Sequence, residues 1–227
     1  MDVRMNHSQR ELLLERLKDE RGKRVIFVSH CLLNENTRYP GGAFREGCLD
    51  ELVDGFQQQG LGICQMHCPE QRAWGGALKR YLLPIYGSRG TLLYRLRHVF
   101  LPLFLWYTRL VYRHLAKEVV RDIEDYLHSS FEVVGIVGVG GSPSCGVCSR
   151  LDLGRSLEAV ATYPLARLDR HVMNEEAVAG CLSEGEGEFI AAIQRELRRK
   201  HLSVRWYEHD LLSEIRGQPI CLRTKQV

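Results

Sequence analysis

The stretch EVVGIVGVG, at residues 132–140, is the part of the sequence that indicates the fold most clearly. It is almost wholly apolar and shows no alternation of apolar and polar residues, which is typical of a strand with both faces covered. Two shorter apolar runs precede it, RVIFVS at 24–29 and LGICQM at 61–66. Because helical patterns separate the expected strands, we predict an α/β fold, a Rossmann-like, mostly parallel sheet flanked by helices.

Helical segments are expected around these strands. Residues 48–59 carry apolar side chains at helical spacing, and Gly60 is suited to end such a helix. Pro102 fits the first turn of a long helix, whose apolar face continues to Leu127. Further helices are expected at 10–18 and 187–201, and further strands at 157–165 and 202–209.

The length and composition indicate a globular chain in a reducing compartment. Its 227 residues are enough for a single α/β domain with an added N-terminal helix. The first 24 residues contain no long apolar centre, so we expect no signal peptide and a cytoplasmic protein. Thiols stay reduced in that compartment. The eight cysteines therefore favour metal binding or catalysis over a disulfide framework.

Residues 71–117 form a basic, aromatic segment that we interpret as an insertion in the domain. It contains nine Lys or Arg residues, no Asp or Glu, and nine of the nineteen aromatic residues of the chain. Such a segment can face an anionic partner, either RNA or a membrane surface. The run VFLPLFLWYT at 99–108 is too short to span a bilayer. We expect a core or dimer-interface helix there, with an amphipathic element at a membrane surface as the alternative.

Three cysteines follow three of the expected strands. Cys31 and Cys68 each come two residues after a strand, and Cys145 comes after a short glycine-rich loop. The carboxyl ends of the strands in a parallel α/β sheet line one edge, and ligands bind at that edge. We therefore expect the three thiols to converge, although 37 and 77 residues separate them along the chain.

The sequences around these cysteines resemble the signatures of a known family. VSHCLLNENTRYPGG, QMHCPE and GGSPSCGV occur in this order between Val28 and Val147. Together they resemble the thiouracil desulfurase (TudS) family, especially its branch of TudS-related desulfidases. The resemblance implies an α/β domain with an oxygen-sensitive [4Fe–4S] cluster, held by one cysteine from each signature. Those ligands would be Cys31, Cys68 and Cys145.

The resemblance also implies a reaction. Three protein thiolates leave one of the four irons open, and an open iron can bind the sulfur of a thiocarbonyl compound. Such an iron could polarise the C–S bond and retain the sulfide while water attacks the carbon. We therefore expect a hydrolytic desulfidase, with a thiolated nucleobase among its candidate substrates.

Further site residues follow from the same resemblance. The serine implicated in catalysis, the first of SPSCG, is Ser142 here. A carboxylate near the second cysteine is also implicated, and Glu70, just after that cysteine, is the nearest acid. The family's RYDG reads RYPGG here, with Pro40 in place of the acid. The position of Glu70 and the proline at position 40 both depart from the family's pattern. These departures concern the identity of the substrate and leave the cluster ligands unchanged. Apart from the resemblance, substrate-binding roles are expected for Asn34, Arg38, Tyr39 and His67, which lie near the candidate ligands in the sequence.

Other interpretations of the third cysteine loop remain open. CGVC at 145–148 could be a thioredoxin-type redox pair, although residues 149–156 are loop-like. With Cys64 and Cys68 it could form a four-thiolate zinc site. GVGGS could bind phosphate, but it lacks a P-loop lysine and a helix directly after it. The alternative function is a non-catalytic iron–sulfur or zinc module that contacts RNA or a membrane; such a module would use a fourth cysteine such as Cys148, which the desulfidase does not need.

Overall fold

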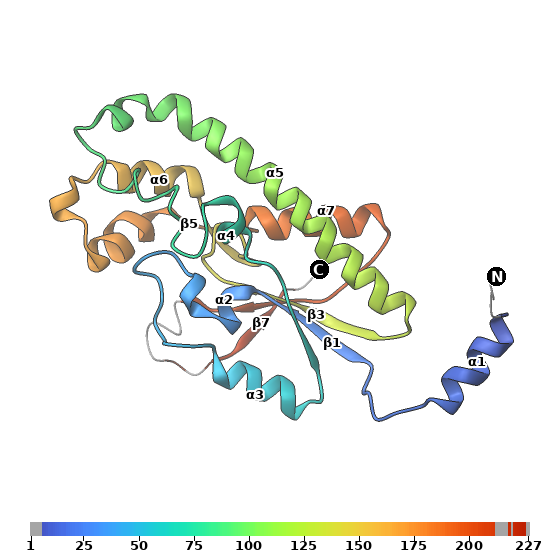
Figure 1. Cartoon of the computed structure of the whole chain (residues 1–227). Coiled ribbons are helices and arrows are strands. Elements are labelled where there is room, and N and C mark those ends of the chain that lie inside the picture. Colours follow the sequence, from blue (N-terminus) through green and yellow to red (C-terminus); the bar gives the residue numbers. More distant parts are fainter. Residues whose placement is uncertain (1–5, 212–217, 219, 226–227) are drawn as a thin grey trace.

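A five-stranded sheet forms the centre of the computed structural model, which describes residues 6–211, 218 and 220–225 (Figure 1). Its strands are β1 (Arg24–Val28), β2 (Gly62–Gln65), β3 (Glu132–Val139), β6 (Trp206–His209) and β7 (Leu222–Thr224). They lie in the order β2-β1-β3-β6-β7, and only the β6–β7 pair is antiparallel. The mostly parallel sheet expected from the sequence is therefore confirmed.

Helices cover both faces of this sheet. α5 (Leu92–His128) and α7 (Glu188–Arg199) lie side by side over one face, and α3 (Asp50–Gln58) lies on the other (Figure 1). This cover explains the uninterrupted apolar sequence of β3, because Ile136 and Val137 are fully buried between the two helical layers.

Short elements surround the carboxyl edge of the sheet. β1 is followed by α2 (His30–Leu33) and the helical turn η1 (Glu35–Thr37), and β2 is followed by α4 (Pro69–Ala73). Beyond β3, a small antiparallel pair of strands and further helical segments fold over the same edge. These are β4 (Ser149–Leu151), α6 (Leu153–Ala161), η2 (Leu165–Arg167), η3 (Val172–Val178), η4 (Ala179–Cys181) and β5 (Leu182–Glu184).

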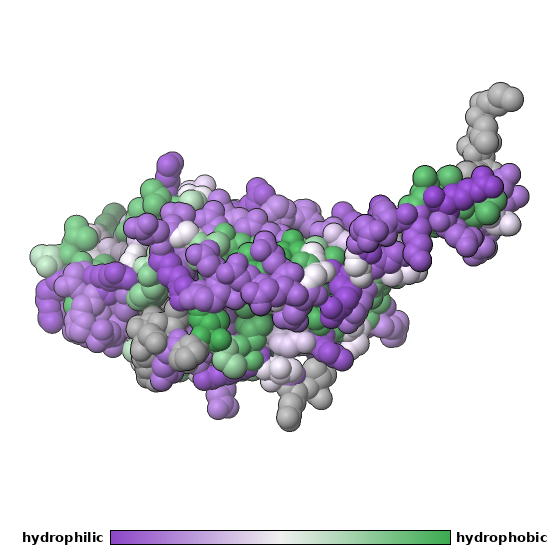
Figure 2. All heavy atoms as spheres, turned by 90° about the horizontal axis from the view of Figure 1, so that it is seen from below, coloured by the Kyte–Doolittle hydropathy of each residue, from purple (hydrophilic) through white to green (hydrophobic). Residues whose placement is uncertain are grey.

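The N-terminal helix α1 (His7–Arg16) is an arm that projects from the body of the molecule (Figures 1 and 2). None of its residues is buried. Its leucines lie exposed among polar side chains, as Figure 2 shows. The expected N-terminal helix is present, and it begins and ends slightly earlier than residues 10–18.

The strand predicted at 157–165 is wrong, because this segment belongs largely to α6. Asp152 caps that helix by accepting a hydrogen bond from the backbone N–H of Arg155 at 3.0 Å. Leu157, Val160 and Ala161 then share one buried face at helical spacing. Residues 149–156 are accordingly not a loop, since β4 and the first turn of α6 occupy them.

Helix α5 begins ten residues before the expected start at Pro102. Thr91 caps it, with Oγ1 accepting from the backbone N–H of Tyr94 at 3.2 Å, and Pro102 lies inside the helix on its exposed side. The cap therefore defines the start of the helix. None of the described helices, α5 included, is long and apolar enough to cross a membrane.

Candidate metal and catalytic site

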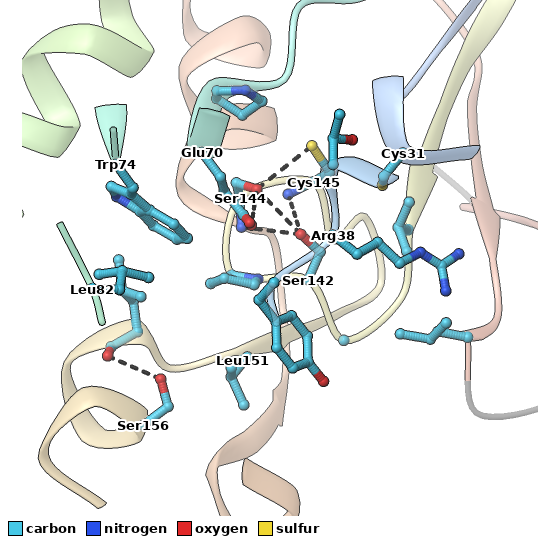
Figure 3. Close-up of a pocket in the computed structure, with 18 of the residues that line it drawn as sticks. Cys31, Arg38, Glu70, Trp74, Leu82, Ser142, Ser144, Cys145, Leu151 and Ser156 are labelled. Atoms are coloured by element: carbon cyan, nitrogen blue, oxygen red, sulfur yellow. Dashed lines mark hydrogen bonds between the residues drawn. The ribbon is translucent and has the colours of Figure 1, made fainter. Parts of the chain in front are cut away.

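The three cysteines expected to converge line one cavity at the carboxyl edge of the sheet. Figure 3 shows two of them, Cys31 and Cys145. Cys31 lies in α2 just beyond β1, and Cys145 lies in the loop after β3. Cys68 is the N-cap of α4, where its Sγ accepts a hydrogen bond from the backbone N–H of Gln71 at 3.3 Å. Because β2, β1 and β3 are adjacent in the sheet, the segments that follow them meet at one place.

Cys68 and Cys145 are buried and Cys31 is partly buried, and the three thiols influence one another. Burial raises the pKa of all three, and that of Cys68 reaches about 12. The negative charges of the Cys31 and Cys68 thiolates raise the pKa of Cys145 further. Cys31 keeps part of its surface open to the cavity. Three such thiols ionise together only when positive charge, such as that of bound metal, is placed between them.

The loop that carries Cys145 is fixed by a buried carboxylate. Glu208, in β6, has no exposed surface. Its Oε2 accepts hydrogen bonds from the backbone N–H groups of Val147, Cys148 and Ser149 at 2.8, 2.6 and 3.1 Å. One strand of the sheet therefore determines the path of the chain just after the cysteine.

The first turn of α7 holds the other side of this loop. The backbone N–H groups of Phe189 and Ile190 both donate to the Ser144 carbonyl, at 3.0 and 3.1 Å. Gly187 makes the close approach possible, because a Cβ there would lie 2.5 Å from the Ser144 carbonyl. Gly187 thus lets the start of α7 pack directly on the cysteine loop.

A hydrogen-bonded row of polar side chains lies beside Cys145 (Figure 3). Ser142 Oγ accepts from the backbone N–H of Cys145 at 3.0 Å and lies 3.2 Å from Ser144 Oγ. Ser144 Oγ in turn donates to Glu70 Oε1 at 2.8 Å. The two predicted catalytic residues, Ser142 and Glu70, are therefore joined through a third side chain.

Glu70 is also paired with a buried lysine. Lys79 Nζ lies 3.1 Å from Glu70 Oε2 and donates to the Thr37 carbonyl at 2.6 Å. Burial disfavours the charged lysine, but the Glu70 carboxylate and the Cys68 and Cys31 thiolates outweigh it and raise the pKa of Lys79. Lys79 is thus a fixed positive charge next to the thiols and the carboxylate.

Two of the expected substrate-binding residues lie at the cavity. Arg38 and Tyr39 both line it, and Arg38 forms a buried ion pair with Glu35 at 3.1 Å. The second oxygen of Glu35 accepts from the backbone N–H groups of Phe44 and Arg45 at 2.8 and 3.0 Å. Glu35 therefore both shapes this loop and neutralises the arginine at the cavity wall.

The structure does not bring Asn34 or His67 into the cavity. Asn34 Oδ1 instead accepts from the backbone N–H of Asn36 at 3.2 Å and caps η1. His67 is exposed and points away, into a separate surface hollow next to Arg72. His30, which precedes Cys31, reaches both hollows, and burial together with the nearby His67 lowers its pKa.

The four-thiolate zinc arrangement is not formed. Cys64 lies on the α5 side of β2, where it interacts with Tyr126, and Cys148 faces the charges of Glu208 and Lys225. Neither lines the cavity of Cys68 and Cys145. Within the described ranges, no three His, Cys, Asp or Glu side chains are placed to hold a single metal ion. Thiolates of an iron–sulfur cluster each bind a different iron, so they need not meet at one ion, and the three buried thiols fit such a cluster.

Three functional residues escaped prediction from the sequence. Lys79 lies in an irregular loop that gives no pattern, and Glu208 lies in a strand whose partner loop is 60 residues away. Ser144 had a signal, because SPSCG contains a second serine directly before Cys145. A short polar side chain next to a candidate ligand cysteine was therefore the one cue available.

Comparison with known proteins adds little to this geometry. No family model matches the chain. No solved structure matches it either. The chain is similar to the uncharacterized protein MJ0003 of Methanocaldococcus jannaschii, with 40% identity over 50 residues. That match covers 22% of this chain and 32% of the archaeal protein, so it spans about a third of the relative's length. Function must accordingly be argued from the site.

Proposed function

We propose that the chain is a [4Fe–4S]-dependent desulfidase that removes sulfur hydrolytically from a thiocarbonyl compound. One observation carries the proposal: Cys31, Cys68 and Cys145 line one cavity, and no fourth cysteine of the described residues joins them. Structural metal sites are usually closed by four protein ligands, whereas three leave a position for substrate. The eight cysteines form no disulfide, which suits a reducing compartment such as the cytoplasm.

Cys31, Cys68 and Cys145 are the residues that would hold the cluster. When bound, the cluster supplies a Lewis-acidic iron with an affinity for sulfur. Burial opposes ionisation of the thiols, but the positive charges of Arg38 and Lys79 favour the thiolate of Cys31, and Lys79 favours that of Cys68. The two cations thus offset part of the effect of burial at Cys31 and Cys68.

The polar row provides the means to move a proton. Because the hydroxyl proton of Ser144 is donated to Glu70, the Ser142 hydroxyl can donate to Ser144 or orient water in the cavity. Glu70 Oε2 is paired with Lys79, and Glu70 Oε1 accepts from Ser144, so the carboxylate is placed to accept a proton through Ser144. The net reaction is R–C(=S)–R′ + H₂O → R–C(=O)–R′ + H₂S. The water oxygen forms the new C=O bond, the C–S bond breaks, both water protons leave with sulfide, and no electrons are gained or lost.

Anaerobic purification tests the proposal. We expect a brown protein with iron and acid-labile sulfide, and release of H₂S from a thiocarbonyl. Single Cys→Ser changes at positions 31, 68 and 145 should each remove most of the iron. Cys148→Ser is the matched control, since it changes a cysteine three residues from a ligand and should keep the full iron content. A colourless protein that contains zinc and no iron, or loss of iron in Cys148→Ser, contradicts the proposal.

We further propose that the basic, aromatic segment contacts an anionic membrane surface. Leu92, Leu96, Val99, Leu103, Trp106 and Leu110 form one exposed row along α5, spaced by four and three residues in turn. The row is about 27 Å long at 1.5 Å per residue. Arg95 and Arg113 lie exposed on the same helix, and segment 71–117 contains no acid. Apolar side chains among cations suit anionic lipid headgroups, whereas a second copy would bring like charges together.

A further inference from the structure

The cavity at the cysteines continues into a part of different chemical character. One end carries the three cysteines with Ser142 and Glu70. The walls beyond them are apolar, and the whole cavity has a volume of about 170 Å³. Its apolar walls include Trp74, Leu82, Leu151, Leu157, Val160 and Met173. We call this end the apolar chamber.

Segments far apart in the sequence build the apolar chamber. Trp74 and Leu82 come from the chain between α4 and α5, Leu157 and Val160 come from α6, and Met173 comes from η3. Each of these five side chains is at most 5% exposed. They are core residues that nevertheless leave a space between them.

The position of Trp74 is fixed from behind. Its Nε1 donates to Thr108 Oγ1, in α5, at 3.1 Å, and its ring packs at 6.4 Å from that of Tyr112. The indole is thus a rigid wall between α5 and the chamber (Figure 3). A chamber with fixed walls is preformed for a ligand, which lowers the entropic cost of binding.

The charged groups at the cavity are already neutralised. Arg38 pairs with Glu35, and Glu70 pairs with Lys79, both at 3.1 Å. Both pairs lie at the cysteine end. A phosphate or carboxylate placed in the apolar chamber would therefore lose its hydration without gaining a counter-charge, which is strongly unfavourable.

Three polar side chains in the far walls, those of Tyr39, Ser156 and Asn174, already have hydrogen-bond partners within the protein. The Tyr39 hydroxyl donates to Asn174 Oδ1 at 2.5 Å, and Ser156 Oγ donates to the Leu153 carbonyl at 3.0 Å. Asn174 Nδ2 donates to the Gly41 carbonyl at 3.2 Å. A nucleobase or sugar, which needs several hydrogen bonds when buried, would compete with these contacts.

We infer that the apolar chamber binds the uncharged, apolar body of the substrate, with the C=S group directed at the cysteine end. The substrate is then a thiocarbonyl on an apolar scaffold, such as an aryl thioamide, and not a thiolated nucleotide. This inference rests on the desulfidase function proposed above. For a thioamide the balance is R–C(=S)–NH₂ + H₂O → R–C(=O)–NH₂ + H₂S, in which the amide nitrogen is retained.

The affinity for the reaction product tests the chamber independently of the reaction. Isothermal titration calorimetry on the anaerobically purified protein would use benzamide, the product of thiobenzamide, and uridine 5′-monophosphate, the product of 4-thiouridine 5′-monophosphate. We expect benzamide to bind at least tenfold more tightly. Equal or tighter binding of the nucleotide overturns the inference.

A variant that fills the chamber can be compared with a control variant of the same kind outside it. Leu157→Phe extends a side chain into the chamber and should weaken benzamide binding at least tenfold. Leu197→Phe is the control, since Leu197 is 3% exposed in α7 and does not line the cavity. If Leu157→Phe does not fold, Val160→Leu tests the same wall with one added carbon. Unchanged benzamide affinity in the folded chamber variant overturns the inference.

Sulfide release distinguishes failure of the chamber from failure of the proposed function. An iron-containing protein that releases sulfide from 4-thiouridine 5′-monophosphate and does not bind benzamide keeps the desulfidase and overturns the apolar substrate. An iron-free protein that binds benzamide but releases no sulfide from any of the thiocarbonyls overturns the desulfidase, and the substrate assignment with it. Faster sulfide release from thiobenzamide than from the nucleotide supports both.

Discussion

Glu70 is the residue at which the structural and chemical roles of the site meet. One of its oxygens accepts from Ser144, and the other faces Lys79, whose side chain has no exposed surface. An ion pair this deep is tied to its partner, because removing one member leaves the other charged and buried. The pair thus fixes the position and direction of the proposed proton acceptor.

Breaking and then neutralising this pair should have opposite effects on stability. Lys79→Met should lower the free energy of unfolding by about 3–5 kcal/mol, because the Glu70 carboxylate stays buried without its counter-charge. The double variant Glu70→Gln, Lys79→Met should recover most of that loss. It should still release sulfide about 10²–10⁴ times more slowly, since the base is gone. Urea unfolding and a sulfide assay measure the two effects; additive stability losses would argue against the pair.

Glu208 acts on the site without reaching the cavity. Glu208→Ala leaves three backbone N–H groups of the cysteine loop without an acceptor, and each such group costs about 1–3 kcal/mol when buried. We expect this variant to be too unstable to purify. Glu208→Gln keeps the acceptor but loses its charge, and should lower the free energy of unfolding by about 1–2 kcal/mol.

An exposed carboxylate provides the control for this prediction. Glu132, in β3, pairs on the surface with Arg24, so Glu132→Gln should change the free energy of unfolding by less than about 1 kcal/mol. Chemical denaturation compares the two Glu→Gln variants directly. Equal losses would mean that Glu208 contributes no more than a surface charge.

At the scale of elements, the site depends on how closely α7 approaches the cysteine loop. Gly187→Ala would place a Cβ 2.5 Å from the Ser144 carbonyl and 2.9 Å from the Gly146 nitrogen, so the loop or the helix must move. We expect a lower melting temperature and less bound iron. Gly55→Ala is the opposite control, because no atom lies within 4 Å of a Cβ at Gly55 in α3. That change should stabilise the protein by about 0.5–1 kcal/mol.

The elements that could be predicted from the sequence are those with the same surroundings on both faces. β3 is buried on both faces, so its apolar run identified it, and the three cysteines after strands were expected to converge for topological reasons. α6 was mistaken for a strand because Val160, near its end, and Thr162 and Tyr163, just after it, favour strands on propensity alone. Tertiary packing, and not local propensity, made this segment a helix.

At the scale of the whole molecule, long-range contacts limit which parts of the site can be predicted from the sequence. The Glu70–Lys79 pair needs an irregular loop, and the apolar chamber needs segments that are about a hundred residues apart, Trp74 and Met173. Neither leaves a periodic pattern, because each residue is placed by the fold and not by its neighbours in the chain. The convergence of the three cysteines was predictable in outline, whereas the Glu70–Lys79 pair and the apolar chamber beside them were not.

The exposed row on α5 leads to the last prediction, which concerns binding of the protein to an anionic membrane surface. We expect the protein to sediment with phosphatidylglycerol vesicles at low salt, to bind phosphatidylcholine vesicles at least tenfold less, and to be released at high salt, since both apolar and ionic contacts are needed. Leu103→Glu, in the middle of the row, should abolish binding. Leu165→Glu, at a residue that is 73% exposed on η2 and outside the row, should leave it unchanged. Salt-sensitive retention of RNA without vesicle binding would assign the surface to nucleic acid instead. A concentration-dependent dimer that Leu103→Glu dissociates would assign it to a second copy of the chain.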